Sequence, residues 1–220
     1  MVHFAMIAAA VLAGTAPAQA ILKPAAVVRA HSVANAPAHL AIRVPKTATY
    51  VGSDRFDLYG IADAEVHIFA EADARKRLTK LYWIQFEHYW PSKPDLTHDY
   101  TRDRREQHWG TTVWVSGGLS VPSEPAKAGS DTEHVRAMLK RAGYTQPETV
   151  MNVRMVQLLD DPKGTGHGRD ELMFIYGEDL APTGKTLAEL TTNGKPNANW
   201  APLEKALVER AVKAFAVERK

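Results

Sequence analysis

The sequence predicts an α+β fold: one mostly antiparallel sheet, made of a meander and a later hairpin, with two helices packed on a face. Apolar and polar residues alternate over residues 78–90, and two further alternating runs flank a glycine-containing loop between residues 150 and 179. Apolar stripes with a helical period occur over residues 130–143 and 201–218. The predicted order along the chain is strands, a helix, a hairpin and a second helix. This order is expected of a single sheet with helices packed on it.

The first strands are expected between residues 56 and 90. Phe56 and Leu58 alternate with polar neighbours, and residues 66–70 alternate in the same way before a charged turn. Period-two alternation bounded by turn residues is typical of antiparallel strands. In the run over residues 78–90, the even-numbered side chains form the better core face, whereas the odd-numbered face mixes aromatic and polar residues. We therefore expect the even face to pack on the hydrophobic interior and the odd face to lie under the loop that follows.

The second half of the chain contains the helix and hairpin signals. Ser130 and Glu133 fit a capping box at the start of a helix, and Gly143 is suited to end that helix in a left-handed conformation. Runs over residues 150–160 and 170–179 are expected to pair as a hairpin. The last helix, at about residues 201–218, has an apolar stripe that needs an apolar partner, and the sheet is the available one.

The first twenty residues have the pattern of a targeting segment. An uninterrupted apolar run over residues 4–13 is followed by helix-breaking residues and by Ala-Gln-Ala at 18–20, a pattern that signal peptidase accepts. The run is shorter than the roughly 20 apolar residues that cross a bilayer. We expect cleavage after Ala20, an extended lead-in over 21–50 and a single α+β domain over 51–220. If this segment is a signal peptide, the protein is expected to be soluble and either periplasmic or secreted. The alternative interpretation of the same segment is a buried N-terminal helix.

Composition limits the classes of function. The 220 residues include no cysteine, so thiol nucleophiles and cysteine–zinc sites are excluded. The formal net charge is +2 with 24% charged residues, and nucleic-acid binding usually needs a strongly basic face. No later stretch is long and apolar enough to be a transmembrane segment. We expect no nucleic-acid partner, and a small ligand or an envelope protein as the possible partner.

The short motifs of this sequence do not match the common nucleotide-binding loops or the nucleophile elbow of serine hydrolases. Gly184-Lys185-Thr186 matches only the end of a phosphate-binding loop, because Asp179 stands where that loop requires glycine. The glycines at 164, 166 and 168 are followed by Arg169, where a dinucleotide fingerprint has glycine, and then by a predicted strand. We expect these glycines to reverse the chain, although His167 and Arg169 at the tip could contact a ligand. No G-x-S-x-G sequence occurs.

The nine histidines do not form a local metal motif. None has the short spacing to another histidine that zinc sites use. A site assembled from distant residues is the alternative, and its candidates are His88, His98, Asp99 and His108. Because no local pair supports that alternative, we expect no metal and no cofactor.

The segment from residue 86 to 109 is the candidate site. It follows the aromatic and polar odd face of the long strand, it has no clear period, and it is rich in aromatic, histidine and charged residues. Long loops in compact domains tend to be functional or disordered, and disordered segments are poor in aromatics. The alternative is a loop whose aromatics only cover one end of the core. The expected ligand-binding residues are Trp83, Glu87, Tyr89, His98, Arg105 and His108.

Three functional hypotheses follow from this segment. The first is an exported, non-catalytic module that binds a small ligand or a partner. The second is a periplasmic acid–base hydrolase, which needs several titratable groups close to one substrate atom. Its candidate groups are Glu87, His88, His98, Asp99 and His108. The third is a purely structural envelope protein, and the sequence identifies neither a ligand nor a reaction.

Overall fold

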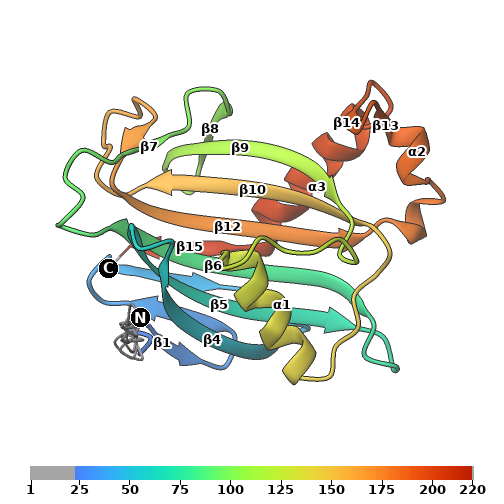
Figure 1. Cartoon of the computed structure of the whole chain (residues 1–220), viewed down its shortest axis with the longest axis horizontal. Coiled ribbons are helices and arrows are strands. Elements are labelled where there is room, and N and C mark those ends of the chain that lie inside the picture. The colour runs from blue at the N-terminus through green and yellow to red at the C-terminus, as the bar shows by residue number, and fades with distance from the viewer. Residues whose placement is uncertain (1–22, 220) are drawn as a thin grey trace, which may run out of the picture.

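A seven-stranded antiparallel sheet organises the chain in the computed structural model, which describes residues 23–219 (Figure 1). In spatial order its strands are β4 (Thr49–Leu58), β5 (Ala62–Ala72), β6 (Leu78–Tyr89), β12 (Asp170–Asp179), β10 (Val150–Leu158), β9 (Thr111–Ser120) and β8 (Arg104–His108). The expected targeting segment, residues 1–20, lies outside the described residues.

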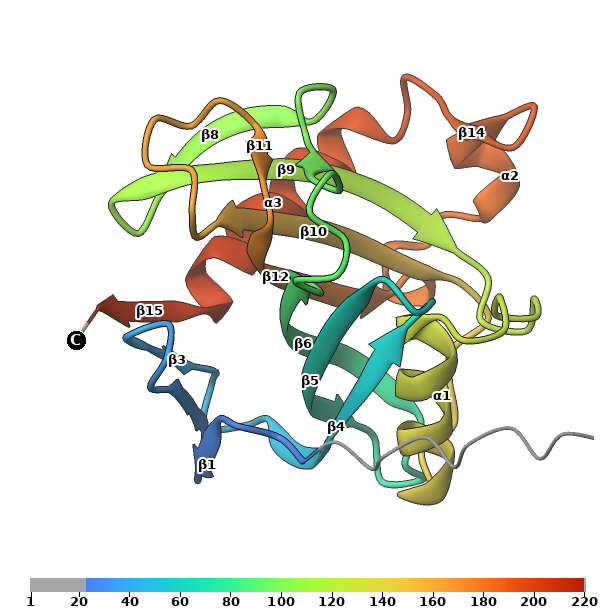
Figure 2. The ribbon, with the colours of Figure 1, turned by 60° about the vertical axis from the view of Figure 1, so that its left-hand side comes forward.

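The prediction of an α+β fold with two helices on one face is wrong. Strands make up 47% of the chain and helices 16%, so the fold is β-rich. The helices α1 (Asp131–Arg141) and α3 (Ala201–Ala214) also pack on opposite faces of the sheet, one in front and one behind (Figures 1 and 2). The two helices could be predicted because the spacing of their apolar residues is visible within a short stretch of sequence. That spacing does not specify which face of a sheet each helix covers.

A second, four-stranded antiparallel sheet joins the two ends of the described chain. Its strands, in spatial order, are β1 (Val27–Arg29), β2 (Ser32–Asn35), β3 (Leu40–Arg43) and β15 (Ala216–Arg219). Residues 21–50, expected as an extended lead-in, therefore contain three strands of this sheet. The last helix ends at Ala214 instead of residue 218, because the residues after Phe215 pair with β3.

The predicted signals at the two ends of α1 are confirmed in part. The Ser130 hydroxyl accepts from the backbone N–H of Glu133, while the Glu133 carboxylate accepts from Gly129 instead of closing the box on Ser130. Gly143 has a φ of 78°, as expected after the helix. The connection over residues 181–200 holds the short elements η1 (Ala181–Thr183), α2 (Leu187–Leu190), β13 (Thr191–Thr192) and β14 (Lys195–Pro196).

Strand β6 is packed on both faces, as the sequence predicts. Its even face, with Tyr82, Ile84 and Phe86, joins the main core under α3 and the smaller sheet. On its odd face, Trp83 is 5% exposed and packs with residues of β5 and α1. No helix within residues 23–219 has both the length and the apolar content needed to span a bilayer.

Two loops fold over the odd face near the end of β6 where the chain leaves the sheet. The loop after β6 contains β7 (His98–Asp99), and the loop between β10 and β12 contains β11 (His167–Gly168). These two short strands pair with each other, with Gly168 opposite His98. The pairing brings His98 back toward the sheet.

Candidate functional site

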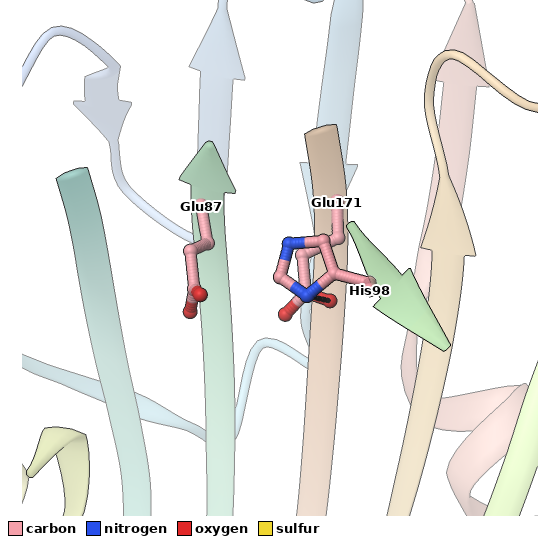
Figure 3. A group of neighbouring side chains, drawn as sticks. All are labelled: Glu87, His98 and Glu171. Carbon is pink, nitrogen blue, oxygen red and sulfur yellow. Dashed lines mark ion pairs between the residues drawn. The ribbon is translucent and has the colours of Figure 1, made fainter. Parts of the chain in front are cut away.

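Two glutamates and a histidine from three separate segments meet on the odd face of the sheet. Glu87 on β6 and Glu171 on β12 are direct partners in the antiparallel ladder, so their side chains leave the sheet side by side. His98 approaches from β7, and its ring lies over the carboxyl group of Glu171 and beside that of Glu87 (Figure 3). One potential ligand atom from each residue lies within 4.8 Å of the others. We call these three residues the Glu–His–Glu cluster.

Arg169 fixes the loop that delivers His98. Its guanidinium donates to the backbone carbonyls of Lys93, Pro94 and Leu96 at 2.9, 2.8 and 2.6 Å, and to those of Tyr89 and Trp90 at 3.4 and 3.2 Å. An arginine presents five donors in a planar fork and can satisfy several carbonyls of one loop. The sequence suggested Arg169 as a loop-tip contact for a ligand, but its hydrogen bonds are used inside the protein.

A chain of hydrogen bonds leads along β6 to the cluster. The indole Nε1 of Trp83 donates to Oε1 of Gln85 at 3.0 Å, and Nε2 of Gln85 donates to Oε2 of Glu87 at 2.9 Å. On the other side, the hydroxyl of Tyr100 donates to Oε2 of Glu171 at 2.6 Å. Each carboxyl group is thus oriented by one neutral donor.

The electrostatic environment disfavours charge on all three cluster residues. Burial raises the pKa of Glu87 to about 7, with a further contribution from the negative charge of Asp131. Burial raises the pKa of Glu171 to about 8, and the neighbouring Glu87 carboxylate adds to this increase. Burial lowers the pKa of His98 to about 4, so its imidazole is neutral at pH 7.

No lysine or arginine within residues 23–219 forms an ion pair with Glu87 or Glu171. The guanidinium of Arg154 lies 5.1 Å from the ring centre of Tyr100, and it pairs with the carboxylate of Asp103 at 2.7 Å. The buried carboxyl group of Glu171 and the partly buried one of Glu87 therefore face each other, and no lysine or arginine of residues 23–219 pairs with either. Buried charges of this kind are stable only when they are paired, protonated or bound to a metal.

The imidazole of His98 is left with an unused nitrogen. Its Nδ1 lies 3.2 Å from Oε2 of Glu171, while its Nε2 has no hydrogen-bond partner in the described part of the chain. The residue is 8% exposed, and its ring packs 4.5 Å from that of Tyr89. A neutral imidazole has one donor and one acceptor nitrogen, so one of these functions remains unmatched in either tautomer.

The structure brings together only part of the predicted site. Glu87, Tyr89 and His98 lie at the cluster, and Trp83 is connected to it through Gln85. Arg105 and His108 lie apart from it, on β8 at the edge of the sheet.

Arg105 and His108 contact residues outside the cluster. The Arg105 guanidinium donates to the backbone carbonyl of Lys163 at 3.4 Å, and Nε2 of His108 lies 2.7 Å from a carboxylate oxygen of Glu106. Neither residue reaches the cluster.

The distant set considered for a metal is not assembled. Of its four members, only His98 belongs to the cluster. His88 pairs with Asp63 across the β5–β6 ladder, on the other face, with 3.7 Å between its Nε2 and Oδ2 of Asp63. Asp99 is exposed and accepts from the backbone and hydroxyl of Thr101.

Glu171 is the cluster residue that the sequence analysis missed, whereas Tyr100 lies within the predicted segment over residues 86–109. Glu171 begins an otherwise apolar side of β12, where Met173 and Ile175 follow it at two-residue steps. That isolated carboxyl among apolar side chains is the available signal, but only the pairing of β12 with β6 shows that it faces Glu87.

Comparison with protein-family models, curated proteins and solved structures finds no match to this chain. The chemistry of the cluster therefore has to be inferred from its own geometry. Two carboxylate oxygens and one imidazole nitrogen are donors that divalent transition metals accept. The same groups could also hold and exchange protons near neutral pH.

Proposed function

We propose that the chain is a non-catalytic binding module and that the ligand of its site is a divalent metal ion held by Glu87, His98 and Glu171. The observation that carries this proposal is the convergence of three potential donor atoms, from β6, β7 and β12, within 4.8 Å of one another. The proposal replaces the expectation of no metal, because Glu171 supplies the ligand that the sequence analysis did not find.

Charge balance supports a dication at this position. The cluster holds two carboxyl groups and a neutral imidazole, and within residues 23–219 neither carboxyl is paired with a lysine or an arginine. A divalent ion would compensate two carboxylates, and it would displace the protons that the raised pKa values of Glu87 and Glu171 retain at pH 7. Metal affinity should therefore increase with pH.

The groups around the cluster suit the orientation of metal ligands. Tyr100 donates to Glu171 and Gln85 donates to Glu87, which fixes the direction of each carboxyl group. Hydrogen bonds of this kind typically change metal affinity by about 10–100-fold when they are removed. The Tyr89 ring, packed against His98, limits rotation of the imidazole.

A metal titration tests the proposal. Protein stripped with a chelator is titrated with Zn²⁺, Mn²⁺ or Ca²⁺ while thermal unfolding and calorimetric heat are recorded. We expect one equivalent of a transition-metal ion to bind, with a stabilisation of about 2.7 kcal/mol when free metal is 100 times the dissociation constant. Glu171→Gln should abolish this effect.

Glu106→Gln is the matched control for that titration. Glu106 also lies 2.7 Å from a histidine, His108, but the pair is at the sheet edge and outside the cluster. The control variant should bind metal like the unaltered chain. Absence of saturable binding by any of the three ions, or equal loss in both variants, would contradict the proposal.

The acid–base hydrolase is the second candidate, and the raised pKa of Glu87 favours it. A carboxyl with a pKa of about 7 can donate and accept a proton near neutral pH, which is the property of a general acid. Nitrophenyl esters, phosphates and glycosides are suitable probes. Turnover that Glu87→Gln abolishes, and that does not need added metal, would favour this candidate over the binding module.

Export remains part of the proposal and rests on the pattern of residues 1–20. Expression of the whole chain in a bacterium with a general secretory pathway should give a periplasmic product that begins at Ile21. Sequencing of the mature N-terminus checks this. An N-terminus that still contains the apolar run over residues 4–13 would argue against cleavage.

A further inference from the structure

A cavity of about 210 Å³ lies between α1 and the odd face of the large sheet. None of the three cluster residues lines it, so it is distinct from the proposed metal site. Its lining comes from β6, β9, β10, β12, α1 and the adjacent loops. The lining residues central to its chemistry are Leu81, Trp83, Arg136, Leu139, Ile175 and Gly177.

Gly177 helps to explain why this space is hollow. It lies on β12 between Leu81 of β6 and Asn152 of β10, and it has no side chain to extend toward α1. A Cβ atom added there would lie 3.1 Å from Cγ1 of Val150 and 3.5 Å from Cβ of Leu81. Its φ is outside the left-handed region, so close packing against Val150, and not backbone conformation, favours glycine at this position.

The walls of the cavity are mostly apolar. Trp83, Leu139 and Ile175 are among the lining residues, and the indole N–H of Trp83 already donates to Gln85. The ring of Trp83 is thus available for packing rather than for hydrogen bonding with an occupant. An apolar cavity of about 150 Å³ is large enough to bind benzene, so this one can hold a single small ring.

Arg136 is the only charged residue among those that line the cavity. Within the described residues no carboxylate lies at ion-pair distance from its guanidinium, which donates to the backbone carbonyl of Glu124. The remaining guanidinium donors match a planar carboxylate, which arginine binds through two parallel hydrogen bonds. Charge complementarity therefore favours an anionic ligand with an apolar body.

We propose that this cavity is a second binding site, for a small aromatic or short aliphatic monocarboxylate. The apolar part of the ligand packs against Trp83 and Ile175, and the carboxylate pairs with Arg136. The lining does not include Glu87, His98 or Glu171, although Trp83 in the lining is connected to Glu87 through Gln85.

Benzoate is the probe for this site, with benzyl alcohol as its uncharged analogue. Benzoate should bind saturably, raise the melting temperature and change tryptophan fluorescence, and benzyl alcohol should bind more weakly. Arg136→Gln should weaken benzoate binding by at least about tenfold, the size expected for loss of a charge-assisted hydrogen bond. Lys140→Gln, which removes a positive charge from α1 outside the cavity lining, is the control and should bind normally.

Ile175→Phe supplies the second arm of the test, because Ile175 lines the cavity, is not fully buried, and a larger side chain there fills the cavity without changing charge. It should abolish benzoate binding, while circular dichroism and the metal response stay as in the unaltered chain. No saturable benzoate binding by the unaltered chain, or equal binding by Arg136→Gln and Lys140→Gln, would overturn the proposal. Since Glu171→Gln removes the metal site alone, unchanged benzoate binding by that variant separates the two sites.

Discussion

Glu171 is a buried carboxyl group whose pKa the folded state raises well above its ordinary value. It is 2% exposed and faces Glu87 across the β6–β12 ladder. Its pKa is raised from 4.5 to about 8 in the folded chain, so the folded state keeps a proton that the unfolded chain releases at lower pH. The stabilising contribution of this group is complete below its unfolded pKa and is lost as pH rises through about 8.

The metal-free protein should therefore become less stable between about pH 6.5 and pH 8.5. Glu87 contributes in the same direction, whereas His98, with its pKa lowered to about 4, acts only below this range. Glu171→Gln mimics the protonated carboxyl and should reduce the decrease. Urea unfolding at pH 6.5 and pH 8.5 measures this decrease in the free energy of unfolding. An equal decrease in Glu171→Gln and in the unaltered chain would contradict the raised pKa of Glu171.

Some residues of the cluster and its surroundings could be predicted from the sequence, and others could not. Glu87 and Tyr89 could be identified because they share one face of a strand with Trp83, and period-two alternation is a local signal. His98 could be placed in the same region because its loop directly follows that strand. Glu171 is 84 positions after Glu87 and joins it only through strand pairing, which depends on contacts distant in sequence.

At the level of elements, the loop between β6 and β8 depends on Arg169. The guanidinium donates to carbonyls over residues 89–96, and β7 then places His98 over the carboxyl group of Glu171 and beside that of Glu87. Arg169→Lys keeps the charge but loses the planar fork, so we expect stability to fall by about 1–3 kcal/mol and metal affinity to decrease.

Amide hydrogen exchange measures the local effect of Arg169→Lys. Exchange should become faster in residues 93–98 and remain slow in β10, since the sheet itself does not use Arg169. Arg105→Lys is the control, because Arg105 is exposed and makes one long hydrogen bond to Lys163. Uniformly faster exchange throughout the sheet would show that Arg169 supports the whole fold instead of this loop.

Elements with local signals could be predicted, and their arrangement could not. The cap at Ser130 and the left-handed Gly143 bound the first helix correctly because each involves residues close in sequence. The faces that α1 and α3 cover depend on the path of the connecting loops. Strand β15 was predicted as helix because no glycine or proline separates residues 216–218 from the apolar stripe before them, and their pairing with β3 overrides that local preference.

In the whole molecule, packing on both faces of the large sheet makes a buried polar cluster possible. The even face is covered by α3 and by the smaller sheet, and the odd face by α1 and the two loops that contain β7 and β11. The loop coverage buries Glu171 and partly buries Glu87, which raises the pKa values of both carboxyl groups and leaves them without a lysine or arginine partner in the described residues.

Anomalous diffraction from crystals of the chain loaded with zinc or manganese tests the metal assignment most directly. We expect one strong peak between Glu87, His98 and Glu171, at about 2.0–2.2 Å from a carboxylate oxygen of each glutamate and a nitrogen of the histidine. Glu171→Gln crystals prepared in the same way should lack the peak. A peak elsewhere on the molecule, or unoccupied space between the three side chains at saturating metal, would contradict the assignment.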